Sequence, residues 1–251
     1  MHELPVLEIG GFHIDLSTWI MIIVSSVIVF VIARLSVRKL SVDNPGKLQN
    51  MMEWVVEFVK GIIASAMDWK HGKPYINLAL TLILFIFVSN LLGLPFAIVT
   101  EHTEELKIAG YTVVHQPEEG HPAHVVWWKS PTADLSVTMG LAVIIFVLTH
   151  YLGMRKNRKH YLKHYVEPYA VFFPLNLIKE ISKPITLGMR LFANIFAGEI
   201  LIATIVMAGL FGIPIMIAWQ GFSIFVGAIQ AFLFTMLSMV YIAQATVHEE
   251  H

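Results

Sequence analysis

The sequence predicts an all-α polytopic membrane protein with five spanning helices, one amphipathic surface helix and a long, tilted C-terminal helix hairpin. Of its 251 residues, 56% are hydrophobic and only 14% are charged. A soluble domain carries about 25% charged residues. The mean hydropathy is +0.68, and several apolar runs reach the roughly 20 residues that a helix needs to cross a bilayer. We expect a single membrane domain over residues 1–251.

The first predicted span covers residues 16–33. No Lys or Arg precedes it, and Arg34, Arg38 and Lys39 follow it directly. A cleavable signal peptide has the opposite order, with a basic region before the apolar one. We therefore expect an uncleaved anchor whose N-terminus lies outside.

Residues 45–68 are predicted to form an amphipathic helix on the cytoplasmic surface. Asn44 followed by Pro45 is a favourable helix start. Apolar residues then repeat at helical spacing, while Glu53, Glu57 and Lys60 share the other face. A helix that simply packs on its neighbours gives the same pattern, so both interpretations stay open.

The second and third spans are expected at residues 75–99 and 134–153, with an outer loop at 100–131 between them. Seven Lys and Arg lie between Arg34 and Lys73, and seven more between Arg155 and Lys183, whereas the loop has two among five Glu. Because cytoplasmic loops are enriched in basic residues, the acidic loop is predicted to be outside. The basic segment 154–184 and the C-terminal tail are predicted to be inside.

The last two spans, at 185–210 and 214–247, are predicted to form the hairpin. A short interfacial helix is expected before them, between Pro168 and Pro184. The final helix would extend about 50 Å, against about 30 Å of hydrocarbon. It must therefore tilt strongly or break, with Gly221 and Gly227 as the candidate break points.

Arg190 is the last basic residue of the chain and lies inside an apolar span, nine residues before Glu199. Ionisable groups at membrane depth are rare and usually functional. Nine residues at 100° each place the two side chains on opposite faces, about 13 Å apart along the axis, so each must serve a different neighbour. Arg190 alone could also reach the interface by extending its side chain.

Other polar residues in the spans are candidates with weaker signals. Asn194 lies one turn beyond Arg190 on the same face. Ser223, Gln230 and Tyr241 are spaced to share one stripe of the last helix. For Ser223 and Tyr241 the sequence favours ordinary interhelical hydrogen bonding, whereas for Gln230, deep in the span, it favours a functional role.

Asn90 lies within the second span, where its amide needs a partner. Asp134 begins the third, where an acidic residue suits a helix N-terminus without any further role.

Several functions are excluded or disfavoured. The chain has no Cys, so it has no disulfide or thiolate site. His160 and His164 have a metal-compatible spacing but lie among five basic residues, which favours a solvated basic loop and predicts no metal site. No phosphate-binding or hydrolase motif occurs, so we expect no cofactor, no catalytic residue and no nucleic-acid partner.

The segment SKPITLGMRLFANIFAGEI at 182–200 closely resembles the signature of subunit a of the F-type ATP synthase. The C-terminal IQAFLFTMLSMVYIAQATVHEEH, GLPF after the second span and PTADLSVTMGLAV at the third also fit this family. The resemblance extends from the second span to the end of the chain.

The resemblance implies a non-catalytic, proton-translocating stator subunit in the membrane sector of the synthase, in a bacterial cell membrane. Its partners would be the c-subunit ring, the b-subunit peripheral stalk and the remaining subunits. Arg190 would match the arginine that faces the ring carboxylate, with two offset half-channels on either side of it. Glu199, Asn194 and Gln230 would match polar residues of the proton path, and Asn90, Asp134, Ser223 and Tyr241 are possible half-channel lining.

Two positions depart from the family pattern. Ser223 stands where some relatives carry a His, and Gly93 where some carry an acid; water could replace those side chains.

Two other classes of function fit the sequence less well. An independent secondary transporter is disfavoured because the sequence has no internal repeat. A structural scaffold would tolerate neutral replacement of Arg190 and Glu199.

Overall fold

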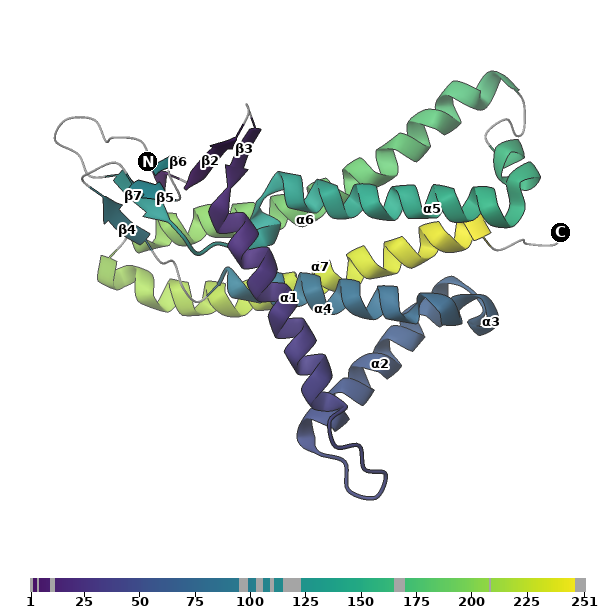
Figure 1. Ribbon diagram of the computed structural model, residues 1–251, viewed down its shortest axis with the longest axis horizontal. Coiled ribbons are helices and arrows are strands. Elements are labelled where there is room, and N and C mark those ends of the chain that lie inside the picture. The colour runs from purple at the N-terminus through teal and green to yellow at the C-terminus, as the bar shows by residue number, and fades with distance from the viewer. Residues whose placement is uncertain are drawn as a thin grey trace.

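The computed structural model describes residues 2–3, 5–9, 12–94, 99–102, 106–108, 111–114, 123–164, 170–207 and 209–246. Five of the described helices are long and apolar enough to cross a membrane, which confirms the predicted all-α polytopic class. Figure 1 shows α4, α5, α6 and α7 running along one axis, with the strands gathered at one end of the bundle and the C-terminal end of α7 at the other.

The long helices of the bundle pack against one another in pairs. Helix α4 packs on α7, α5 on α6, and α6 on α7. The bounds of these four helices are α4 Ile76–Leu92, α5 Leu135–His164, α6 Phe173–Val206 and α7 Gly212–Thr246. Short turns precede them at α3 Trp69–Gly72, η1 Lys73–Tyr75, η2 Pro131–Ala133, η3 Ala170–Phe172 and η4 Gly209–Phe211.

Helices α1 (Leu16–Ser36) and α2 (Lys47–Ala66) form a V whose apex points away from the bundle and whose two arms reach it (Figure 1). Helix α1 is held against α4 at its outer half, where Ser17, Thr18, Met21 and Ser25 are buried. Small side chains at this contact allow the two backbones to approach closely. The amphipathic α2 buries Met52, Val59, Ile62 and Ile63, so its apolar face packs on the bundle.

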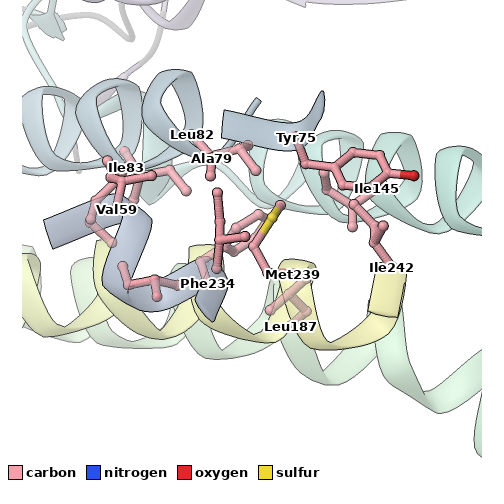
Figure 2. Close-up of a cluster of buried hydrophobic side chains, with 14 of the residues drawn as sticks. Val59, Tyr75, Ala79, Leu82, Ile83, Ile145, Leu187, Phe234, Met239 and Ile242 are labelled. Carbon is pink, nitrogen blue, oxygen red and sulfur yellow. The ribbon is translucent and has the colours of Figure 1, made fainter. Parts of the chain in front are cut away.

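The main hydrophobic core lies where α2, α4, α5 and α7 meet (Figure 2). Val59, Ala79, Phe234 and Met239 are among its most buried side chains. Helix α6 contributes only Leu187 and Leu191, which stand on either side of Arg190 in the sequence. Helix α6 is therefore the least enclosed of these helices, and much of its surface remains available to a partner or to lipid.

Seven short strands, which the sequence analysis did not predict, occur before α1 and in the outer loop. The order β1-β7-β4 forms one sheet, with His2 and Glu3 parallel to His124 and Val125. Two hairpins, β2-β3 and β5-β6, accompany it. The strands are β1 His2–Glu3, β2 Val6–Ile9, β3 Phe12–Asp15, β4 Val99–His102, β5 Leu106–Ile108, β6 Tyr111–Val114 and β7 Ala123–Val126.

The start of the amphipathic helix differs from the prediction. Its N-cap is Gly46 rather than Asn44, and no side chain caps it. The Gln49 side chain bonds back to the Ser41 backbone through its Nε2 (2.9 Å) and its Oε1 (3.1 Å). This tether fixes the chain entering the helix, so the Asn44–Pro45 start is not used.

The predicted second span was too long. Helix α4 ends at Leu92, and Val99 already belongs to strand β4. A Cβ on Gly93 would lie 2.5 Å from the Ser130 Cβ, so the close approach of the segment before α5 requires glycine here. The helix ends where this segment crosses it.

The boundaries around the basic segment were also wrong. Helix α5 continues to His164, so residues 154–164, predicted to lie in the basic segment after the third span, are helical. Helix α6 runs through Pro184 without interruption, which joins the predicted short helix to the fourth span. Membrane helices tolerate an internal proline when neighbouring helices support the backbone, and α5 and α7 both pack on α6.

The last helix is unbroken. Helix α7 passes through both Gly221 and Gly227 as one element of 35 residues. A Cβ on Gly227 would lie 3.2 Å from the Asn90 Cβ. This glycine therefore serves a close contact with α4 rather than a break.

Replacing Gly188 by Val should destabilise the bundle. A Cβ at this position would lie 2.7 Å from the Met139 Sδ and 3.2 Å from the Thr138 carbonyl oxygen, so α5 and α6 must separate. Overpacking of this kind destabilises by about 1–3 kcal/mol. The thermal unfolding temperature of the purified protein should fall, whereas Gly140→Ala in α5, which meets open space, should leave it unchanged. An equal change in both variants would contradict the proposed close contact.

Candidate functional site

A cavity of about 180 Å³ lies between α4, α6 and α7. Its polar lining comes from Asn90, Asn194, Glu199 and Ser223, together with Trp219. Liquid water occupies about 30 Å³ per molecule, so the cavity has room for several waters. Of the residues that the structure describes, Glu199 is the one with an ionisable side chain lining the cavity.

Glu199 is held from outside its own helix. Its Oε1 accepts a hydrogen bond from the backbone N–H of Ser130, at 3.2 Å. Ser130 belongs to the segment at residues 127–134, which connects strand β7 to helix α5. This segment brings a backbone donor to a carboxylate at membrane depth, where unpaired polar groups are costly.

A continuous hydrogen-bond network fixes the same segment to two helices. The Ser130 hydroxyl donates to the Ser89 carbonyl (2.9 Å) and shares a hydrogen bond with the Thr132 hydroxyl (2.7 Å). Thr132 donates to Asn90 Oδ1 (2.6 Å), and Asn90 Nδ2 donates to the Gly227 carbonyl (2.9 Å). Asn90 thus finds its partners in a network joining α4 to α7.

An ion cluster lies beside this network at the strand end of the bundle. Lys129 forms ion pairs with Asp15 and, at 3.6 Å, with Asp134. The Thr18 hydroxyl bonds to both carboxylates, at 2.8 Å and 3.2 Å. The Asp15 carboxylate also caps the start of α1 through Ser17, so the cluster ties α1 to α5.

The cluster lowers the pKa of both carboxyls. Burial raises the pKa of Asp15, but Lys129, Ser17 and Thr18 outweigh it and hold that pKa below 3.8. Burial also raises the pKa of Asp134, and hydrogen bonds from Ser136, with the charge of Lys129, bring it below 3.8 as well. Both carboxylates are therefore ionised at neutral pH.

Arg190 does not line the cavity, although Asn194, one turn beyond it on α6, does. Arg190 forms no ion pair among the described residues. Its electrostatic neighbour is Tyr241 of α7. The surface of α6 around it exposes Ile185, Met189 and Phe196.

The structure therefore separates the predicted site residues into groups. Asn90, Asn194, Glu199 and Ser223 meet at the cavity, whereas Arg190 and Tyr241 lie elsewhere. Gln230 is buried in α7, 7% exposed. Asp134 hydrogen-bonds to the Ser136 N–H at the start of α5 (2.9 Å) and does not line the cavity.

Sequence analysis missed Lys129, Ser130, Thr132 and Trp219 as part of this region. One signal was available: Lys129 is one of two basic residues in an otherwise acidic loop, five residues before Asp134. Nothing in the sequence indicates that a backbone amide would approach Glu199.

The ion cluster should make the acid stability of the protein depend on Asp15. A carboxyl whose pKa is lowered on folding contributes stability above its unfolded pKa, and this contribution disappears as the pH falls through the folded value. The Asp15→Asn variant should therefore unfold at a lower temperature than the wild-type protein at about pH 6–7. The difference should shrink below about pH 3.8.

Asp43→Asn is a matched control, because Asp43 is exposed in the turn between α1 and α2. Its unfolding temperature should follow wild type at every pH. A constant difference between Asp15→Asn and wild type across the acid range would show that the ion cluster does not stabilise the fold.

Known proteins match the chain over almost its whole length. The family described as ATP synthase A chain matches residues 16–243. ATP synthase subunit a of Priestia megaterium is 47% identical over 250 residues, covering 96% of each chain. The same subunit of Anoxybacillus flavithermus is 47% identical over 99% of each chain, and that of Bacillus subtilis 44% identical over 99% of each. The chain therefore belongs to the ATP synthase subunit a family.

Proposed function

We propose that this chain is the proton-translocating stator subunit of an F-type ATP synthase, forming two offset half-channels against the c-subunit ring. It catalyses no reaction alone. It would lie in a bacterial cell membrane with its N-terminus outside and its C-terminus in the cytoplasm, as the distribution of basic residues indicates. The b-subunit peripheral stalk would hold it fixed beside the ring.

The placement of Arg190 carries this proposal. It lies within an apolar helix and pairs with no carboxylate among the described residues of its own chain. A cation at membrane depth requires a partner or water. A carboxylate presented by the ring would supply the partner, and it would do so only when that carboxylate reaches this point.

The exposed face of α6 suits such a neighbour. Ile181, Ile185, Met189, Phe196 and Ile200 are exposed along it. Ala193 and Ala197 are also exposed, and a Cβ on Gly198 would meet open space. Small residues of this kind allow a second membrane helix to approach closely.

The chemistry follows from the free energy of charge in lipid. A ring carboxylate that faces lipid stays protonated, because an ionised carboxylate in that environment costs roughly several kcal/mol or more. Beside Arg190 its ionised form is stabilised, so the proton leaves. The fixed positive charge of Arg190 also blocks direct passage of protons between the two sides.

The cavity at Glu199 supports a half-channel on the strand side of the bundle. It carries one carboxylate, two amides and a hydroxyl around a space large enough for water. Glu199 and Asn194 would pass protons towards the ring, with Asn90 and Ser223 as lining. Gln230 would act near Arg190, and Tyr241 and Asp134 remain candidates for lining residues elsewhere on the path.

Replacing Arg190 by Ala should abolish ATP-driven proton pumping while the complex still assembles. The ring carboxylate would then lack the cation that releases its proton. Pumping can be followed by quenching of a pH-sensitive dye in inverted membrane vesicles, with assembly measured as ATPase activity of the purified complex. Arg155→Ala is the matched control, because Arg155 is exposed and bonds only weakly to the Tyr151 hydroxyl (3.3 Å). Pumping retained by the Arg190 variant would disprove the proposal.

Filling the cavity should slow proton pumping without affecting assembly. Ser223→Leu places an apolar side chain beside Glu199 and displaces water, so we expect a loss of about tenfold, equivalent to about 1.4 kcal/mol. The matched control is Ser26→Leu, on the exposed side of α1. Equal rates in the two variants would show that protons do not use the cavity.

A further inference from the structure

We infer that Lys129 is a positioning residue for Glu199, and that its ion cluster links helix α1 to the proton site. This inference rests on the proposed function and deepens it. Lys129 forms no hydrogen bond with Glu199. It would act through the peptide group that joins it to Ser130, and through its charge.

The covalent link is short and stiff. The N–H that donates to Glu199 belongs to the peptide bond between Lys129 and Ser130. Because that peptide group is planar, its direction follows the position of the Lys129 Cα. Whatever holds Lys129 therefore aims this donor at the Glu199 carboxylate.

The Lys129 side chain is held by two carboxylates in a partly enclosed site. The side chains of Lys129, Asp15 and Asp134 are 12%, 15% and 22% exposed. Ion pairs shielded from water in this way are screened less than surface pairs. Thr18 fixes both acids at once, which leaves Lys129 a single well-defined position.

Other contacts hold the residues on either side of Lys129, independently of its ion pairs. Trp128 Nε1 donates to the Leu92 carbonyl (2.7 Å), and the Ser130 hydroxyl is bonded to Ser89 and Thr132. Gly93 allows Ser130 to lie directly against α4. The Lys129–Ser130 peptide group is thus anchored to α4 on one side and, through Asp15, to α1 on the other.

Helix α1 gains a role through this arrangement. It lines neither the cavity nor the surface around Arg190. Its Asp15 nevertheless holds Lys129, whose charge also acts on Glu199. Among the described residues no other charged side chain lines the cavity, where α4, α6 and α7 contribute amides, a hydroxyl and an indole.

The first test compares Lys129→Gln with Lys129→Arg in the complete synthase. ATP synthesis by inverted vesicles is driven by an acid–base transition, and its rate is measured against the lumen pH. Both the Ser130 N–H and the Lys129 ammonium favour the ionised carboxylate of Glu199. The Lys129→Gln substitution removes the ammonium and the ion pairs that position the N–H. It should therefore strengthen proton binding by Glu199 and slow proton release to the ring.

We expect the maximal rate of Lys129→Gln to fall about threefold to tenfold. The lumen pH at which the rate is half-maximal should rise by about half a unit to one unit. Lys129→Arg keeps the positive charge and should restore both values to within about twofold of wild type. A purely structural defect would lower the maximal rate alone and leave the half-maximal pH unchanged.

Asp15→Asn provides a second variant should Lys129→Gln fail to assemble. It removes the nearer carboxylate while preserving size, so the same shift in half-maximal pH is expected with a smaller amplitude. An unchanged half-maximal pH in every assembled variant would overturn the inference. That result, with Arg190→Ala still inactive, would leave the proposed function intact, whereas pumping by Arg190→Ala would remove the proposed function itself.

Discussion

A charged side chain at membrane depth has to be paired, and Arg190 has no acidic partner among the described residues of its own chain. The organisation of the bundle is consistent with this constraint. Helix α6 turns Leu187 and Leu191 into the core and leaves the surface around Arg190 exposed. Because the described residues provide no counter-charge, Arg190 is available to a carboxylate of a partner subunit, as the proposed function requires. A partner carboxylate that is ionised only beside Arg190 would pair with it only at that position, so the pairing would be coupled to movement of the partner.

Glu199, nine residues after Arg190 on α6, follows the opposite rule. Glu199 has its partner within the chain, and this partner is a backbone N–H from a segment that is distant in sequence. A backbone donor cannot be removed by titration, so its interaction with Glu199 does not depend on the protonation of the donor. Asn90 and Thr132 are occupied in holding this segment. Their polarity is therefore explained by structure before any transport role is assigned to them.

Family membership and the local geometry support different parts of the interpretation. The comparisons establish the family along nearly the full chain. They do not identify which side chains meet. The cavity at Glu199, the ion cluster at Lys129 and the separation of Arg190 from both come from the arrangement of helices. Ser223 lies at the cavity, and space for water remains beside it.

The sequence by itself determined the class of protein, the five apolar helices and the opposite placement of Arg190 and Glu199. These depend on composition, on the length of apolar runs and on 100° per residue, which are local properties. Helix ends were predicted less well. Leu92 ends α4 because Ser130 packs on Gly93, and α6 continues through Pro184 because α5 and α7 support it.

Only the tertiary structure decided which polar groups meet. Ser130 and Glu199 are separated by 69 positions, and Asn90 and Gly227 by 137. No periodicity relates such residues, because their contact depends on how whole helices pack. The short strands were missed for the same reason: His2 pairs with His124 only after the chain has crossed the bundle and returned.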